Sequence, residues 1–128
     1  MNVDQFLAEV KNLADLGNDE EAEKATRATL EALRERLAGN EPSNLAAQLP
    51  PEIASYIEGS DGQDSFDLAE FYSRVAQKEG VGQDEAAKHA RAVATVLQTA
   101  VTGGELDHVH SQLGNEHKEL FGQPGASA

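Results

Sequence analysis

The residues best suited to chemistry lie near the C-terminal end, where Glu105, His108 and His117 fall within a short acidic segment. Glu105 and His108 are three residues apart, the spacing with which one helix offers two ligands to a metal ion. A di-iron site in a helical bundle needs a second Glu-x-x-His pair, and the sequence has none. Histidines in an acidic surface segment are by default solvated, so no cofactor is expected. As an alternative to this expectation, the stretch from His108 to His117 forms a metal-binding or small-ligand site.

The other reactive groups do not form a recognisable catalytic motif. His89 borders the apolar side of a helix expected over residues 84–102, which favours an edge residue over an acid-base catalyst. The run Gly59-Ser60-Asp61-Gly62 has no strand before it and is no nucleophile elbow. The run Gly80-Val81-Gly82 lacks the third glycine and the lysine of phosphate loops. Because the chain has 23 acids, two carboxylates that lie close together are weak evidence for a catalytic pair. With no catalytic motif found, the chain is expected not to be an enzyme.

Acidic residues dominate the charge of the whole chain. The formal net charge is -13, from twelve acids and five bases in residues 1–58 and eleven acids and five bases in residues 59–128. No basic cluster appears along the sequence. A uniformly negative surface repels phosphate backbones and anionic lipid, so neither nucleic acid nor a membrane is expected as a partner. Solubility, a cytoplasm rich in salt, or a partner protein with a basic segment would each account for such a surface.

Compartment signals favour the cytoplasm. The sequence has no cysteine, and therefore no disulfide and no thiol chemistry. Its first residues lack the basic and apolar regions of a signal peptide, and its longest weakly polar run, 92–101, is far shorter than the roughly 20 residues that span a bilayer.

Apolar spacing, caps and breakers predict an all-α fold. Asn18 or Asp19 is expected to cap the second helix, and Asp67 with Glu70 has capping-box spacing. Gly17 is expected to end the first helix. The expected helices cover residues 3–16, 19–37, 42–48, 51–57, a helix to 79 that starts near Ser65 or Asp67, then 84–102, 105–112 and 115–121.

Two halves of the chain repeat one plan of long helix, long helix, short elbow helix and short helix. Residues 1–58 form the first repeat and residues 65–121 the second, with a linker at 59–64 and a disordered tail at 122–128. Matches at one constant offset include Phe6 with Phe71, Val10 with Val75, Gly17 with Gly82 and Asp19 with Asp84. After a single deletion inside the long helix, the matches continue with Leu33 and Leu97, Gly39 and Gly103, Gln48 and Gln112, and Leu49 and Leu113. The expected fold is one helical bundle in which two pseudo-two-fold related repeats share a core.

Three polar residues are candidates for the groove between the repeats. Arg36 falls inside the apolar arc of its helix, whereas the matching position holds Ala100. Its stem either covers apolar surface with the guanidinium in water, or it pairs with a carboxylate of the second half and fixes how the halves dock. Gln48 and Gln112 stand at matching places beside leucine, where they are expected to bond backbone groups at the elbows or to flank a groove.

The chain resembles the domain of unknown function family numbered 2267 over nearly all of residues 4–121. The motifs that carry the resemblance are Phe6-Leu7 with Val10 and Gly17, then Leu30, Leu33, Arg36 and Leu37, then 45–50, then Tyr56, Glu58 and Gly59, then Gly104-Glu105-Leu106 with Val109, Gln112 and Leu113. Ser60 stands where the family often has tryptophan, and Leu113-Gly114 replaces leucine-proline. The resemblance implies a duplicated all-helical domain and brings no activity or catalytic residues.

The function expected from the sequence is that of a non-enzymatic protein-interaction module. Its partner is expected to be a protein with a basic segment, received by the groove between halves or by the elbow helices. The metal or small-ligand site at His108 to His117 and adaptation to high salt stay as alternatives. The sequence leaves monomer and homodimer undecided.

Overall fold

In the computed structural model, all regular elements of the described residues are helices, which confirms the predicted all-α class. The structure describes residues 1–37, 41–58, 66–113 and 119–121, and for residues 41, 108 and 110–112 the backbone alone. The linker at 59–64, the tail at 122–128 and most of the helix expected over 115–121 lie outside these residues. The helices are α1 (Val3–Ala14), α2 (Asp19–Arg36), α3 (Glu41–Ala46), α4 (Pro51–Ala54), α5 (Leu68–Glu79), α6 (Gln83–Ala100) and α7 (Gly103–Gln112).

Side-chain caps fix where three of these helices begin. Asn2, Asn18 and Asp67 each accept a hydrogen bond from the backbone N–H three residues later, which satisfies a donor that the first turn leaves without a partner. Asn2 also takes part in a capping box with Gln5. For the second helix the sequence left Asn18 and Asp19 open as caps, and for the fifth helix a start near Ser65 or Asp67; the caps are Asn18 and Asp67.

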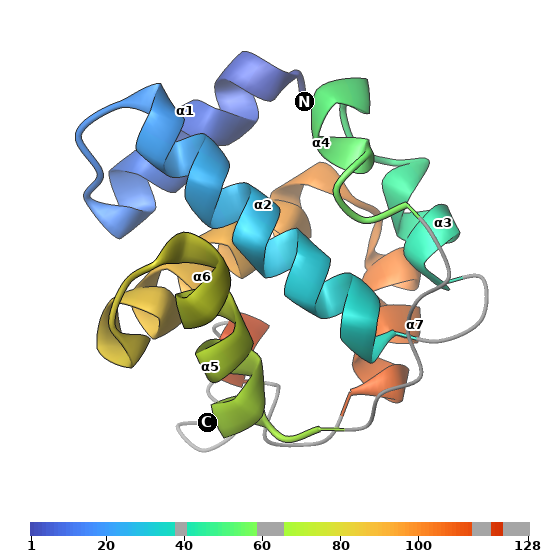
Figure 1. The fold of residues 1–128 in the computed structure, drawn as a ribbon. Coiled ribbons are helices and arrows are strands. Elements are labelled where there is room, and N and C mark those ends of the chain that lie inside the picture. The colour runs from blue at the N-terminus through green and yellow to red at the C-terminus, as the bar shows by residue number, and fades with distance from the viewer. Residues whose placement is uncertain (38–40, 59–65, 114–118, 122–128) are drawn as a thin grey trace.

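The long helices pack around one core. α1 and α2 contact each other, as do α5 and α6, while α1 also packs on α6, and α2 on both α5 and α6. In Figure 1, α2 crosses the front of the molecule with α6 behind it. α3 packs on α4 and α7. The largest fully buried side chains are Phe6, Phe71, Phe121, Leu30, Leu33, Leu37, Leu45, Ile53, Ile57, Leu97 and Leu120.

The first helix ends earlier than the sequence predicted. Its last residue is Ala14, and Asp15, with φ of 58°, adopts the left-handed conformation that was expected at Gly17. Aspartate reaches this conformation at lower cost than most residues, because its short polar side chain can bond nearby backbone groups. α5 ends in the same way at Gly80, with φ of 73°. The other boundaries differ from the expected ranges by a few residues at most.

No helix within the described parts of the chain combines the length and the apolar character needed to cross a membrane.

The left-handed turn at Gly80 gives a stability prediction. Gly80→Ala is expected to lower the free energy of unfolding by about 1 to 2 kcal/mol, because an added Cβ makes this conformation costly. The cost is conformational, since the Cβ itself would meet no atom within 4 Å. The matched control is Gly104→Ala, which also meets open space but lies in α7 and is expected to be neutral or stabilising by up to about 1 kcal/mol. Urea unfolding measures both, and equal losses would contradict the assignment of strain to Gly80.

Candidate functional site

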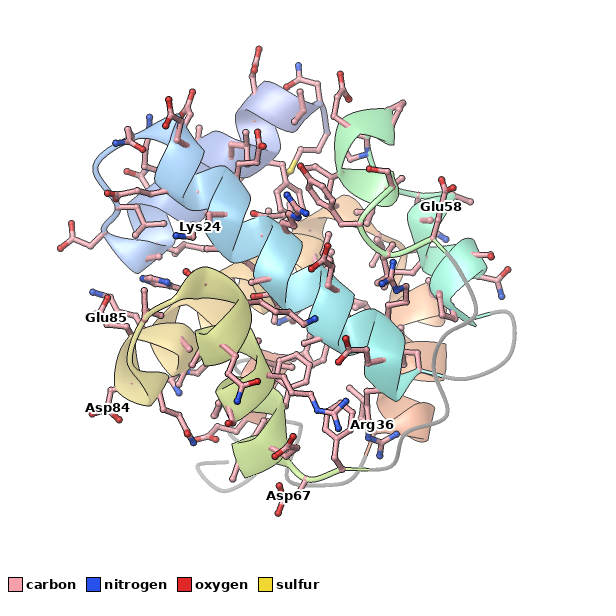
Figure 2. The ribbon with its side chains drawn as sticks, viewed as in Figure 1. Lys24, Arg36, Glu58, Asp67, Asp84 and Glu85 are labelled. Atoms are coloured by element: carbon pink, nitrogen blue, oxygen red, sulfur yellow. The ribbon has the colours of Figure 1, made fainter. Side chains whose placement is uncertain are left out.

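A hollow lies where the α1–α2 turn meets the α5–α6 turn. Its volume is about 260 Å³. Both turns lie at the left of Figure 1, and Figure 2 shows Lys24, Asp84 and Glu85 at that end of the bundle. The residues that line it are Leu16, Glu21, Lys24, Glu79, Val81, Glu85 and His89. It therefore combines a small apolar portion with five ionisable side chains.

Glu79 and His89 form a buried pair in the wall of this hollow. Glu79 is the last residue of α5 and is 3% exposed, while His89, in the second turn of α6, is 5% exposed. His89 Nδ1 lies 2.7 Å from Glu79 Oε1, within hydrogen-bond distance. His89 Nε2 lies 3.3 Å from Oε2 of the more exposed Glu85, one helical turn earlier. The imidazole is thus held between two carboxylates.

The two contacts of His89 cannot both be hydrogen bonds from a neutral imidazole. A neutral imidazole carries one N–H and can donate to one carboxylate only. Two hydrogen bonds would need one further proton, on the imidazole or on one of the two carboxyl groups.

Burial raises the pKa of Glu79 above its ordinary value of 4.5. The hydrogen bond with His89, the charge of His89 and the charge of Lys24 act in the opposite direction without cancelling the effect of burial. One oxygen of the carboxyl, Oε1, lies within hydrogen-bond distance of His89. The other, Oε2, is buried and has no hydrogen-bond partner among the described residues. A buried acceptor without a partner is costly, so Glu79 Oε2 marks a place where a donor would be bound favourably.

Sequence reasoning placed His89 at an edge and did not identify Glu79. A signal existed for the glutamate, since Phe71, Val75 and Glu79 recur every four residues and all three are buried. The proposed repeat offers a second signal. At the offset that relates Phe6 to Phe71, the position of Glu79 matches Ala14 and that of His89 matches Lys24. A buried alanine in one repeat thus corresponds to a buried glutamate in the other.

The candidate metal ligands are not brought together by the residues that the structure describes. Glu105 lies in the first turn of α7, is 8% exposed, and its Oε2 has no partner among the described residues. The side chain of His108 and the whole of His117 fall outside those residues. Within the described part of the chain, no group of three or more His, Cys, Asp or Glu residues is placed to hold a metal ion.

Two of the groove candidates make contacts between the halves. Arg36 Nε donates to the carbonyl oxygen of Phe66 at 3.2 Å, so this contact with the second half is to the backbone. Figure 2 shows Arg36 near Asp67, far from Lys24 at the other end of α2. Gln48 Oε1 accepts a hydrogen bond of 2.7 Å from the backbone N–H of Thr102, just before α7. The side chain of Gln112 lies outside the described residues.

Comparison with known proteins gives one family. Residues 3–120 match a family described as "Uncharacterized conserved protein (DUF2267)", which is the family that the motifs of the sequence resemble. The match includes every residue that lines the hollow. No curated protein matches the chain.

Proposed function

The chain belongs to the DUF2267 family of uncharacterized conserved proteins, and from that premise we propose a function that rests on its own geometry. It is a non-enzymatic interaction module, and the hollow between the two turns receives a cationic side chain from a basic segment of a partner protein. The observation that carries this proposal is Glu79 Oε2, a buried carboxylate oxygen without a partner among the described residues in the wall of an acidic hollow. An ammonium or guanidinium group is the donor that such an oxygen accepts best.

Charge in and around the hollow favours a cation. Glu21, Glu79 and Glu85 line it, against one lysine, Lys24, and His89. Outside it, the first turns of α2 and α6 add Asp19, Glu20 and Asp84. The surrounding field therefore attracts a basic segment before contact, as complementary charge does in steered association.

The size of the hollow favours a single side chain. At about 260 Å³ it lies below the range of about 300 to 1,000 Å³ that is usual for small-molecule sites. Among the described residues, the large apolar side chains that are exposed are Met1 and Leu13. With so little exposed apolar surface in the described part of the chain, recognition there rests on charge and on filling the hollow.

The arrangement of His89 supports a binding role over acid-base catalysis. Both of its ring nitrogens already face carboxylates, Nδ1 toward Glu79 and Nε2 toward Glu85. Proton transfer to a bound molecule would require one of these contacts to break first. We therefore include the absence of enzymatic activity in the proposal.

The pseudo-two-fold relation between the repeats is part of the same proposal. α1 and α5 both have 12 residues, and α2 and α6 both have 18. Exchanging α1 with α5 and α2 with α6 leaves the set of contacting long helices unchanged. For example, the contact of α1 with α6 becomes the contact of α5 with α2, which is also present. Leu16 and Val81, which line the hollow, occupy matching positions in the two turns. A partner side chain would thus enter between the halves.

Binding of a fluorescent hexalysine peptide, followed by anisotropy, tests the proposal. Glu85→Gln is expected to weaken binding about fivefold, or ~1 kcal/mol, because it removes a carboxylate from the rim. Glu79→Gln is expected to weaken binding at least as much, since the neutral amide no longer offers a charged acceptor. Affinity should also fall as salt is raised, because exposed charges are screened.

Glu52→Gln is the matched control. Glu52 is exposed on α4, outside the residues that line the hollow, and its replacement changes the net charge by the same amount. The expected affinity is close to that of the unaltered protein. Equal weakening by Glu52→Gln and Glu85→Gln would show that the peptide is held by the overall charge, and would reject the hollow as the binding site.

A further inference from the structure

Most of the basic side chains of this acidic protein lie on two helices. The chain has ten lysines and arginines, nine of them in the described residues, and six of the nine lie on α2 and α5. These six are Lys24, Arg27, Arg34, Arg36, Arg74 and Lys78. The same helices carry eight acids, six on α2 and two on α5, so an excess of positive charge can only be local. Because the two helices pack on each other, bases that are far apart in sequence can meet at one hollow.

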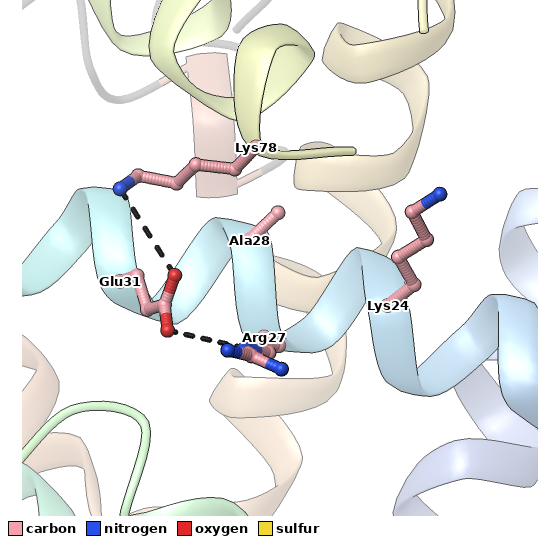
Figure 3. Close-up of a pocket in the computed structure, with 5 residues that line it drawn as sticks. All are labelled: Lys24, Arg27, Ala28, Glu31 and Lys78. Carbon is pink, nitrogen blue, oxygen red and sulfur yellow. Dashed lines mark hydrogen bonds and ion pairs between the residues drawn. The ribbon is translucent and has the colours of Figure 1, made fainter. Parts of the chain in front are cut away.

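A second hollow with a mainly cationic lining lies where α2 and α5 pack on each other. Its volume is about 450 Å³, and it is lined by Lys24, Arg27, Ala28, Glu31 and Lys78. Figure 3 shows the methyl group of Ala28 on α2 between the lysines, which extend from α2 and α5. Three of its five lining residues are cationic and one is acidic. A small side chain at position 28 leaves room between long charged ones.

The pairing of these charges is uneven. Glu31 lies between two of the bases, with Oε2 3.2 Å from Arg27 Nε and Oε1 4.0 Å from Lys78 Nζ. Lys78 is also paired with Glu35 at 2.9 Å. Lys24 has neither an ion pair nor a hydrogen bond among the described residues. The side chain of Arg27 is 63% exposed, and the single contact with Glu31 uses its Nε.

We propose that this hollow binds a small molecule bearing a phosphate group, held by Lys24, Arg27 and Lys78. The guanidinium of Arg27 presents further N–H donors with the forked geometry that suits two phosphate oxygens, and the two ammonium groups add charge. The volume of about 450 Å³ falls within the usual range for small-molecule sites, which the Glu79 hollow does not reach. Glu31 already contacts two of these bases, Arg27 and Lys78. A bound phosphate would replace the Glu31 carboxylate as the anion that these bases contact.

The overall charge limits the ligand to a small one. At a net charge of -13 the chain repels a long polyanion, whose many phosphates would face acidic surface beyond the hollow. A single phosphate group meets only the local bases, since charges farther away than about 10 Å are largely screened at about 0.1 M salt. The argument for this site does not rest on the proposed binding of a basic segment, although Lys24 lines both hollows.

Titration with inorganic phosphate at constant ionic strength, followed by ¹H–¹⁵N NMR, tests the site. Saturable shifts are expected at backbone amides around Lys24 to Glu31 and around Lys78. Lys24→Gln is expected to weaken binding about fivefold, or ~1 kcal/mol. Glu31→Gln is expected to strengthen it by a similar factor, because it removes the competing carboxylate. The two variants thus shift affinity in opposite directions.

Lys88→Gln on α6 is the control for the loss of one exposed positive charge. This variant is expected to bind phosphate with the same affinity as the unaltered protein. Lys24 makes no ion pair or hydrogen bond with described residues, so its replacement leaves the fold intact. The proposal would be overturned if no saturable shift appeared up to about 50 mM phosphate, because any dissociation constant would then be far weaker than is usual for specific binding. Equal weakening by Lys88→Gln and Lys24→Gln would overturn it as well.

Discussion

Replacing His89 with alanine is expected to lower the free energy of unfolding by about 3 to 5 kcal/mol at pH 7, which is the usual effect of removing one member of a buried charged pair. Glu79, 3% exposed and already with one unpartnered oxygen among the described residues, would lose its hydrogen bond to the imidazole. The buried carboxyl would then have to ionise without that support or take up a proton. Urea unfolding at several pH values measures the loss.

The pH dependence of this loss identifies its cause. Because burial raises the pKa of Glu79, the stability linked to its protonated form is fully present below the unfolded value of 4.5 and is lost as pH rises through the folded value. Removing His89 also removes an influence that lowers this pKa, so the alanine variant should lose stability more steeply above pH 4.5. The expected loss relative to the unaltered protein is therefore smaller in acid than at pH 7.

A double variant supplies the control. Glu79→Gln combined with His89→Ala removes the buried charge together with its partner, and is expected to recover part of the loss at pH 7 and to abolish its pH dependence. If His89→Ala alone loses the same stability at pH 4 as at pH 7, and Glu79→Gln recovers none of it, the imidazole stabilises the fold through packing and not through its pair with Glu79.

Phe6→Ala and Phe71→Ala are each expected to cost about 3 to 5 kcal/mol, the range for truncating a phenylalanine in a packed core. Both side chains are 0% exposed. Phe6 is the fourth residue of α1 and Phe71 the fourth residue of α5, which are matching positions in the proposed repeats. If the halves are related by a pseudo-two-fold axis, the two losses should be close to each other. Chemical denaturation at pH 7 measures both variants.

Leu13→Ala gives the matched control on the same helix. Leu13 is 51% exposed, so its truncation should change stability by no more than about 0.5 kcal/mol. Losses at Phe6 and Phe71 that differ by more than about 2 kcal/mol, beyond the spread usual for one kind of core substitution, would contradict equivalent packing of the two halves.

Local signals explain why the helices could be predicted from the sequence. Asn18 and Asp67 cap helices through bonds to residues three positions away, so composition and spacing suffice to find them. The end of α1 was placed too late because Gly17 is the stronger signal for a left-handed turn, whereas the protein uses Asp15. Choosing between neighbouring residues that both tolerate this conformation depends on packing of the turn, which sequence spacing does not contain.

The candidate site was harder to predict because it depends on pairing across a turn. His89 and Glu79 are ten residues apart on different helices, and with 23 acids in the chain nothing in the spacing selects Glu79 as the partner. The hollow lined by Lys24 and Lys78 was missed for a related reason, since charge counted along the sequence is even while the fold brings these two lysines together. Arg36 stood out in the sequence because it falls inside an apolar arc, but a backbone acceptor such as the Phe66 carbonyl has no signature in side-chain types.

Lys24 lines both hollows, so the two proposed binding events, if both occur, would be thermodynamically linked. Its charge lowers the pKa of Glu79 on one side, and its side chain lines the hollow that contains Arg27 on the other. An anion bound beside the ammonium group would offset its positive charge and so favour a cation in the first hollow. Each ligand would then raise the affinity of the other by the same factor, because such coupling is reciprocal. Two ligands of opposite charge would bind cooperatively to a protein that need not change its backbone.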